Sequence, residues 1–138
     1  MDNQTSIPKA VMDRLAEKGA QTRIAVVGAS NDPEKYGNII TKNLSGKGYT
    51  VLPVNPKEPE IAGIPAFGNL ASVPGPIHIV DFVTPPPVTL KVLQNTDPAI
   101  ADAFWLQDGS FDDAVIEYAE GRFPNLVHHA CIMVVSNY

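Results

Sequence analysis

Residues 28 to 37, which read GASNDPEKYG, carry the clearest chemical signal in the sequence. Gly28 permits a tight turn and lets a ligand approach the backbone. The stretch joins an apolar, β-branched run to a helical pattern, and the unpaired amides at a helix start suit a phosphate. Ser30 adds a hydroxyl donor and Lys35 a positive charge. We expect a phosphate-binding loop, and a plain strand-to-helix loop flanked by glycines is the alternative.

A second chemical position, Asn55-Pro56-Lys57, follows the next apolar run. An NAD site would place an acidic residue at this strand end to hold the ribose hydroxyls, after a G-x-G-x-x-G loop. The sequence has asparagine here, and Ser30 and Pro33 replace the second and third glycines of that loop. A lysine at position 57 favours a ligand with an extra phosphate near its ribose, and a solvated loop lysine is the alternative.

The single cysteine, Cys131, comes shortly after His128 and His129. On a strand these two histidines would point to opposite faces, so at most one could serve the cysteine as a base. We therefore favour a structural cysteine over a catalytic one. With His78 added, these residues show no short-range ligand spacing, so we predict no metal site. Asp81 interrupts an apolar run and is a further candidate for a functional role.

The elements that must position these residues are five short apolar runs. Their starts are 27, 27, 25 and 23 residues apart, which fits a strand plus a crossover helix. We predict a single Rossmann-like α/β domain, a five-stranded parallel sheet with helices on both faces. The runs are Arg23–Gly28, Thr50–Val54, Ile77–Val83, Asp102–Leu106 and Asn125–His129. Pro53 conflicts with a central strand, so we expect weaker pairing there.

Helical patterns occupy the segments before and between these runs. Phe111–Glu120 is the best of them, with Ser110 as the expected cap and Gly121 as the stop. Thr84 is the expected cap of the helix at Val88–Asn95. The remaining patterns are Ser6–Lys18, Asn38–Lys47 and a weak, short helix near Asn69–Ser72.

Composition limits the classes of function. The chain has 138 residues and a net charge of −5, which suits one domain and argues against a general nucleic-acid binder. No apolar run reaches a membrane span and the first residues do not form a secretory signal, so we expect a cytoplasmic protein. Ten of the thirteen prolines lie between Pro53 and Pro98. We expect two of them, Pro56 and Pro85, to stiffen the rim of a ligand site.

Five motifs in order carry a resemblance to a known family. They are VVGAS, VLPVNPK, IHIVDFVTPPP, FWLQDGS and HHACIMV, and they extend from Thr22 to Val134. Together they resemble the small single-domain CoA-binding proteins, relatives of the CoA-binding domain of the succinyl-CoA synthetase alpha subunit. We accordingly divide the chain into an N-terminal amphipathic helix, residues 1–21, and a CoA-binding Rossmann-like domain, residues 22–138.

The resemblance implies coenzyme A or an acyl-CoA as the ligand and a role for each matching segment. By the resemblance, the CoA phosphates would lie on Gly28, Ala29 and Ser30, and the nucleotide end on Asn55, Pro56 and Lys57. The adenine or pantetheine path would be lined by Val83, Thr84 and Pro85. The family turn after the fourth strand matches Gln107 and Gly109, and the family cysteine after the fifth strand matches Cys131. The position of Cys131 near the thiol end suggests a reversible mixed disulfide with CoA.

Two departures from the family pattern restrict what is carried over. His128, His129 and Ala130 precede the cysteine, where family members often have arginine or aspartate. The second domain of the ligase, which bears its phosphorylated histidine, has no counterpart, so we expect binding without catalysis. An NAD(P)-binding, oxidoreductase-like protein on the same fold is the alternative, and a purely structural homodimer is a third. Association as a homodimer or with a partner enzyme stays open.

Overall fold

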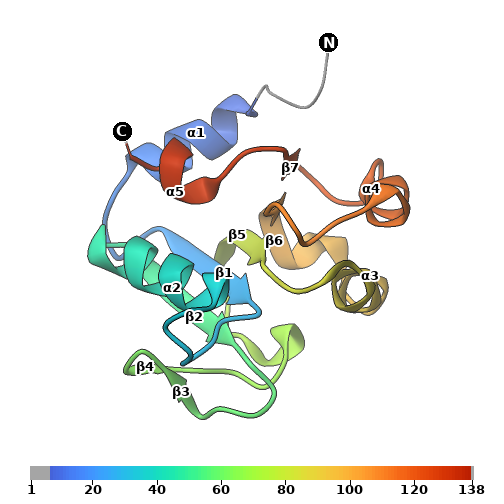
Figure 1. Ribbon diagram of the computed structural model, residues 1–138. Coiled ribbons are helices and arrows are strands. Elements are labelled where there is room, and N and C mark those ends of the chain that lie inside the picture. The colour runs from blue at the N-terminus through green and yellow to red at the C-terminus, as the bar shows by residue number, and fades with distance from the viewer. Residues whose placement is uncertain (1–6, 138) are drawn as a thin grey trace.

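The computed structural model describes residues 7–137 (Figure 1). Its centre is a five-stranded, all-parallel sheet with strand order β2-β1-β5-β6-β7. The strands are β1 (Arg23–Val27), β2 (Thr50–Val54), β5 (Ile77–Phe82), β6 (Ala101–Leu106) and β7 (Leu126–His128). The predicted five-stranded Rossmann-like domain is therefore confirmed.

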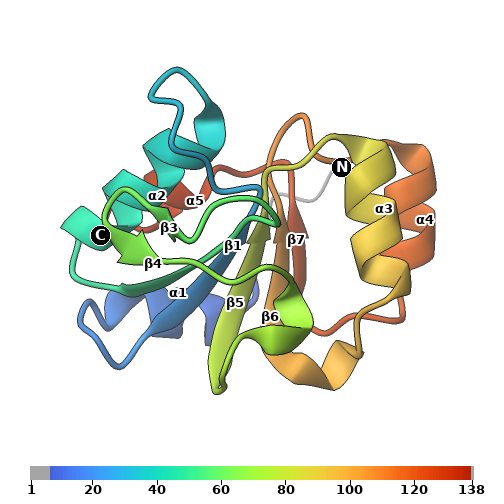
Figure 2. The ribbon, with the colours of Figure 1, turned by 90° about the horizontal axis from the view of Figure 1, so that it is seen from below.

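Helices cover both faces of the sheet, because nearly every side chain of each strand is apolar and successive side chains point to opposite sides. One face packs against α1 (Lys9–Ala16), α2 (Tyr36–Gly46) and α5 (Ile132–Val135). The other packs against α3 (Pro86–Gln94) and α4 (Asp113–Ala119), and Figure 2 shows the two layers on either side of the strands.

The proline-rich crossover between β2 and β5 contains little regular structure. It forms a small hairpin, β3 (Glu60–Ile61) with β4 (Ile64–Pro65), and a 3₁₀ turn at Leu70–Ser72. Asn69 caps that turn by accepting a hydrogen bond from the Ser72 N–H, so the predicted weak helix is a single turn. A second 3₁₀ turn, Pro98–Ile100, precedes β6.

Helix starts differ from the predictions in detail. Asp112, not Ser110, caps α4 by accepting a 3.0 Å hydrogen bond from the Val115 N–H. The Ser110 hydroxyl instead donates to the carbonyl of Gln107. Gly121 follows α4 with a φ of +80°, the left-handed conformation expected of a helix stop.

The predicted caps and limits of the other helices also need correction. Pro85 is the N-cap of α3, and the Thr84 hydroxyl bonds that of Thr89 at 2.7 Å instead of capping the helix. The N-terminal helix covers Lys9–Ala16, and Ser6, its predicted first residue, lies outside the described residues.

The predicted weakening at Pro53 is wrong. The register of β2 on β1 runs unbroken from Thr50 to Val54. The Thr50 N–H and the Val54 carbonyl both bond toward β1, so Pro53 faces the outer side of this edge strand. Because the missing donor points away from the sheet, no ladder hydrogen bond is lost.

The strand order reverses between β1 and β5, because the chain passes from β1 to β2 on one side and then returns to β5 on the other. A ligand crevice in such a sheet lies outside the carboxyl ends of these strands. Among residues 7–137, no helix is long and apolar enough to cross a membrane.

Candidate functional site

A cavity of about 580 Å³ lies at the carboxyl ends of β1, β2 and β5, beside α3. Seven of the twelve residues predicted for the site line it: Gly28, Ala29, Ser30, Lys35, Asn55, Pro56 and Thr84. The structure therefore brings these seven predicted residues together around one cavity, at the place where the strand order reverses.

Two positions around the loop after β1 have no space for a side chain. Gly28 has a φ of +101°, and a β-carbon on it would lie 2.8 Å from Val83 Cγ2. A β-carbon on Gly37, in the first turn of α2, would lie 2.1 Å from the carbonyl oxygen of Gly28. Both positions therefore require glycine, and the requirement at Gly37 was not foreseen from the sequence.

The loop presents unused hydrogen-bond donors. Within residues 7–137, the backbone N–H groups of Ala29 and Ser30 make no hydrogen bond. The Ser30 hydroxyl oxygen accepts from the Asp32 N–H at 3.0 Å, so its own proton is free to donate. The Asn38 side chain donates to the Ser30 carbonyl at 2.9 Å and fixes the loop against α2. Such a group of fixed donors at the start of an 11-residue helix suits an anion.

Asn55 joins the loops that follow β1 and β2. Its Nδ2 donates to the Ala29 carbonyl at 2.9 Å, and its Oδ1 accepts from the N–H groups of Lys57 and Glu58 at 2.7 and 3.1 Å. Because both ends of the amide make hydrogen bonds, Asn55 fixes the rim of the cavity.

The other predicted residues lie outside the cavity lining. Lys57 is next to the lining residue Pro56, Val83 lies under Gly28, and Pro85 begins α3. Pro56 is therefore the only one of the two expected rim prolines that lines the cavity. Sequence reasoning missed Lys91, a lining cation on α3, because one lysine on a helix has no distinguishing pattern.

Gln107 and Cys131 belong to a separate cluster around Tyr36. The Tyr36 hydroxyl is 3.0 Å from Cys131 Sγ, and Gln107 Nε2 donates to that hydroxyl at 3.1 Å. Gln107 Oε1 accepts from the Ile132 N–H at 3.0 Å, which fixes the start of α5. Tyr36 directly follows the lining residue Lys35, so the backbone at the start of α2 connects the cluster to the cavity.

The surroundings of Cys131 favour its thiolate. Burial acts to raise the pKa of the thiol, but hydrogen bonds from Tyr36 and from the N–H groups of Met133 and Val134 outweigh it, and the pKa is lowered. Burial, followed by the contact with Cys131, raises the pKa of Tyr36, so the phenol keeps its proton and donates to sulfur.

Asp81 lies beneath this cluster on β5. It is fully buried, and neither carboxylate oxygen has a hydrogen-bond partner within residues 7–137. Burial raises the pKa of Asp81 well above its usual value, and the nearby Cys131 adds to the effect. The neutral carboxyl is therefore favoured, so Asp81 adds no negative charge that would oppose ionisation of Cys131.

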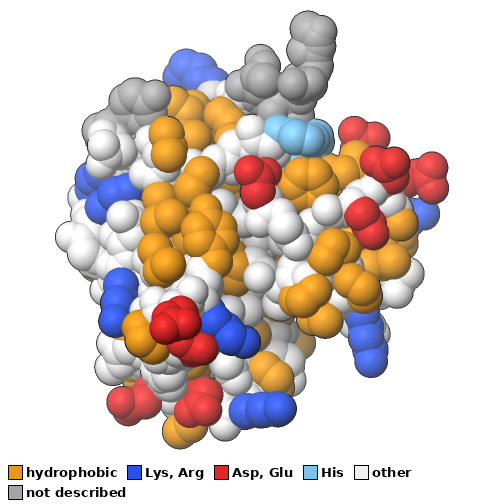
Figure 3. Space-filling model, in the orientation of Figure 1, with side chains coloured by type: hydrophobic (Ala, Val, Ile, Leu, Met, Phe, Trp, Pro, Cys, Tyr) orange, Lys and Arg blue, Asp and Glu red, His pale blue; other side chains and the backbone are white. Residues whose placement is uncertain are grey.

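The two histidines do not point to opposite faces, which corrects the prediction from strand alternation. β7 ends at His128, and His129 has a φ of +63°, which turns its ring back toward its neighbour. Their Nδ1 atoms are 2.6 Å apart, and both rings contact Phe111. Histidine side chains are exposed beside β7 in Figure 3. Among the residues described, no three His, Cys, Asp or Glu side chains are placed to hold a metal ion.

The fold and the cavity define a candidate ligand site at the carboxyl ends of an open parallel sheet, and comparisons with known proteins identify the family. The family model described as "CoA binding domain" matches residues 22–137, so the chain belongs to this family. It is 30% identical over 112 residues to the uncharacterized protein YneT of Bacillus subtilis (strain 168), covering 81% of this chain and 83% of that one.

Two further relatives are archaeal. The alpha subunit of the ADP-forming acetate–CoA ligase II of Pyrococcus furiosus is 43% identical over 63 residues, covering 45% of this chain and 14% of the subunit. The solved structure of a conserved hypothetical protein from Pyrococcus furiosus superimposes with a TM-score of 0.77 at 38% identity, covering 82% of this chain and 97% of that one. The ligase subunit is thus far longer than the segment that this chain matches.

The hydrogen bond from Tyr36 to Cys131 yields a prediction about thiol reactivity. Tyr36→Phe removes a donor to the thiolate, so the pKa of Cys131 should rise and alkylation by iodoacetamide at neutral pH should slow by about tenfold. The measurement is the alkylation rate as a function of pH. Tyr118→Phe is the matched control, because Tyr118 lies on α4 under the Arg122 guanidinium and makes no contact with Cys131. Equal rates for all three proteins would contradict the assignment.

Proposed function

We propose that the protein binds coenzyme A or an acyl-CoA without catalysing a reaction of it, with the diphosphate on the loop of Gly28, Ala29 and Ser30. One observation carries the proposal. Unbonded backbone donors and a free hydroxyl proton are fixed at the edge of a cavity of about 580 Å³, at the start of α2. Membership of the family supports CoA as the source of the phosphates.

The distribution of charge favours the same ligand. The chain carries a net charge of −5, yet two of its lysines, Lys35 and Lys91, line the cavity. Lys57 is adjacent, on the loop that Asn55 holds in place. CoA carries a diphosphate and a 3′-phosphate, so cations are needed at two places. We propose that Lys57 binds the 3′-phosphate and that the two lining lysines attract the phosphate groups of CoA in general.

The thiol end of the ligand would extend toward Cys131. Lys35 lines the cavity and Tyr36 contacts the cysteine, so the start of α2 links the two parts of the site. A pantetheine arm that leaves the loop along this helix start would reach the thiolate. Val83, Thr84, Pro85 and Gln107 would lie along or beneath that path. We place the whole site in the domain of residues 22–138, with residues 1–21 as an added helical segment.

A panel of ligands tests the proposal against the NAD(P) alternative. Thermal unfolding is measured with CoA, acetyl-CoA, NAD, NADP and ATP. At one hundred times its dissociation constant, CoA should stabilise the protein by about 2.7 kcal/mol, whereas NAD should have little effect, because Asn55 replaces the acidic ribose ligand. A preference for NADP would favour the oxidoreductase-like alternative. No response to any ligand would favour a purely structural protein.

The assignment of the 3′-phosphate predicts a difference between two ligands. Lys57→Ala should weaken the binding of CoA by about tenfold and leave dephospho-CoA nearly unchanged, because the second ligand lacks that phosphate. Lys91→Ala should weaken both. Titration calorimetry supplies the dissociation constants, and Lys42→Ala, on the outer side of α2, is the matched control. If Lys57→Ala weakens both ligands to the same extent, the lysine does not hold the 3′-phosphate.

The lowered pKa of Cys131 predicts a mixed disulfide with CoA. The Cys131 thiolate attacks one sulfur of CoA disulfide, the Cys131–CoA bond forms as the sulfur–sulfur bond breaks, and CoA leaves as a thiolate. Mass spectrometry after incubation with CoA disulfide should show one added CoA, which dithiothreitol removes. Cys131→Ser should remain unmodified. An unmodified wild-type protein that still binds CoA would refute the mixed disulfide alone.

A further inference from the structure

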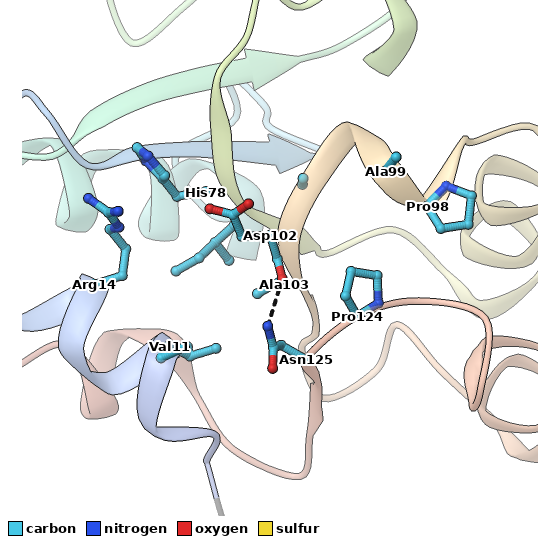
Figure 4. Close-up of a pocket in the computed structure, with 12 residues that line it drawn as sticks. Val11, Arg14, His78, Pro98, Ala99, Asp102, Ala103, Pro124 and Asn125 are labelled. Atoms are coloured by element: carbon cyan, nitrogen blue, oxygen red, sulfur yellow. Dashed lines mark hydrogen bonds between the residues drawn. The ribbon is translucent and has the colours of Figure 1, made fainter.

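A second cavity, of about 470 Å³, lies at the opposite edge of the sheet, where α1 crosses the amino ends of β5 and β6 (Figure 4). Its apolar lining includes Val11 of α1, Ile79 of β5 and Ala103 of β6. Ligands of open α/β sheets usually bind at the carboxyl ends of the strands, so the CoA-binding fold does not account for a cavity at this edge.

Opposite charges flank this second cavity. In Figure 4 the Arg14 side chain extends from α1 on one side, and the Asp102 carboxylate lies across from it on β6. Arg14 Nη1 is 3.3 Å from Glu17 Oε1, which leaves the other guanidinium nitrogens free to donate. The Asp102 carboxylate makes no hydrogen bond or ion pair with any residue from 7 to 137. The cavity thus offers one cation and one unpaired anion.

His78 adds an oriented hydrogen-bond donor between these charges. Its Nδ1 accepts from the Arg23 N–H at 3.0 Å, so in the neutral ring the proton is on Nε2. Burial, followed by the nearby Arg14, lowers the pKa of His78, although Asp102 acts in the opposite direction, and the neutral ring is favoured. The ring therefore donates through Nε2 at neutral pH.

The rim is held in place by the backbone around it. Asn125 has a φ of +48°, and its side chain donates to the Asp102 carbonyl at 2.9 Å, as the dashed line in Figure 4 shows. On the other side, the Thr22 hydroxyl bonds the last turn of α1 through the Glu17 carbonyl at 2.7 Å. Arg14 and Asp102 are thus carried by elements fixed relative to the sheet.

We propose that this cavity binds a small zwitterion with an apolar body, the chemical class of free aliphatic α-amino acids. The carboxylate would bond Arg14 and the Nε2–H of His78, the ammonium would bond Asp102, and the side chain would cover Val11, Ile79 and Ala103. A ligand with only one charge leaves one rim charge unpaired, so both charged groups of the ligand are needed. This cavity shares no lining residue with the cavity at the carboxyl ends of the strands, so the two sites are separate.

The test compares leucine with two analogues that each lack one charge, 4-methylpentanoate and isopentylamine. Titration calorimetry and ligand-observed NMR on the full chain should detect leucine, with both analogues at least tenfold weaker. Valine and methionine extend the series of side chains. Arg14→Gln and Asp102→Asn should each weaken leucine by tenfold or more. In Asp102→Asn, 4-methylpentanoate should bind as well as leucine does, because the repelling carboxylate is gone.

CoA binding and circular dichroism of the same variants serve as controls, and both should match the wild type. If the wild type binds leucine but not CoA, the proposed function is contradicted and this inference still holds. The inference is overturned if wild-type protein binds no aliphatic amino acid at millimolar concentration, if 4-methylpentanoate binds as tightly as leucine, or if neither variant changes leucine binding. Light scattering that shows an Arg14-dependent dimer would assign the cavity to a second copy and overturn it as well.

Discussion

The contact between Gly37 and the carbonyl oxygen of Gly28 determines the geometry of the site. A β-carbon at Gly37 would be 2.1 Å from that oxygen, so only glycine lets α2 begin directly over the end of β1. The placement of α2 lets Asn38 hold the loop that lines the cavity, and it also brings Tyr36 to Cys131. A single steric condition thus affects both the loop of Ala29 and Ser30 and the contact between Tyr36 and Cys131.

Side-chain amides fix the loops that surround this contact. Asn38 holds the loop to α2, Asn55 joins the loops after β1 and β2, and Asn31 bonds both Glu60 and Ala62 of the hairpin region. Each amide uses its side chain to satisfy backbone groups that a loop would otherwise leave to water. The backbone N–H groups of Ala29 and Ser30 are not used in this way by any of residues 7–137.

The sheet could be predicted from the sequence because buried parallel strands are nearly continuous apolar runs at regular intervals, as Arg23–Val27 and Ala101–Leu106 show. The helix caps could not, since the choice of Asp112 over Ser110 depends on the backbone path of one turn. His129 was misplaced for a similar reason, because a positive φ cancels strand alternation. Lys91 and the cavity beside α1 depend on tertiary packing, which leaves no local pattern in the sequence.

The outer side of β2 has a consequence for how chains can associate. Pro53 has no amide proton to offer there, and its carbonyl and the Asn55 N–H are both taken by Phe67. From Pro53 to Asn55, an incoming strand would therefore find neither a donor nor an acceptor. Copies of this chain that meet at this end of β2 must associate through side chains and not through a shared sheet.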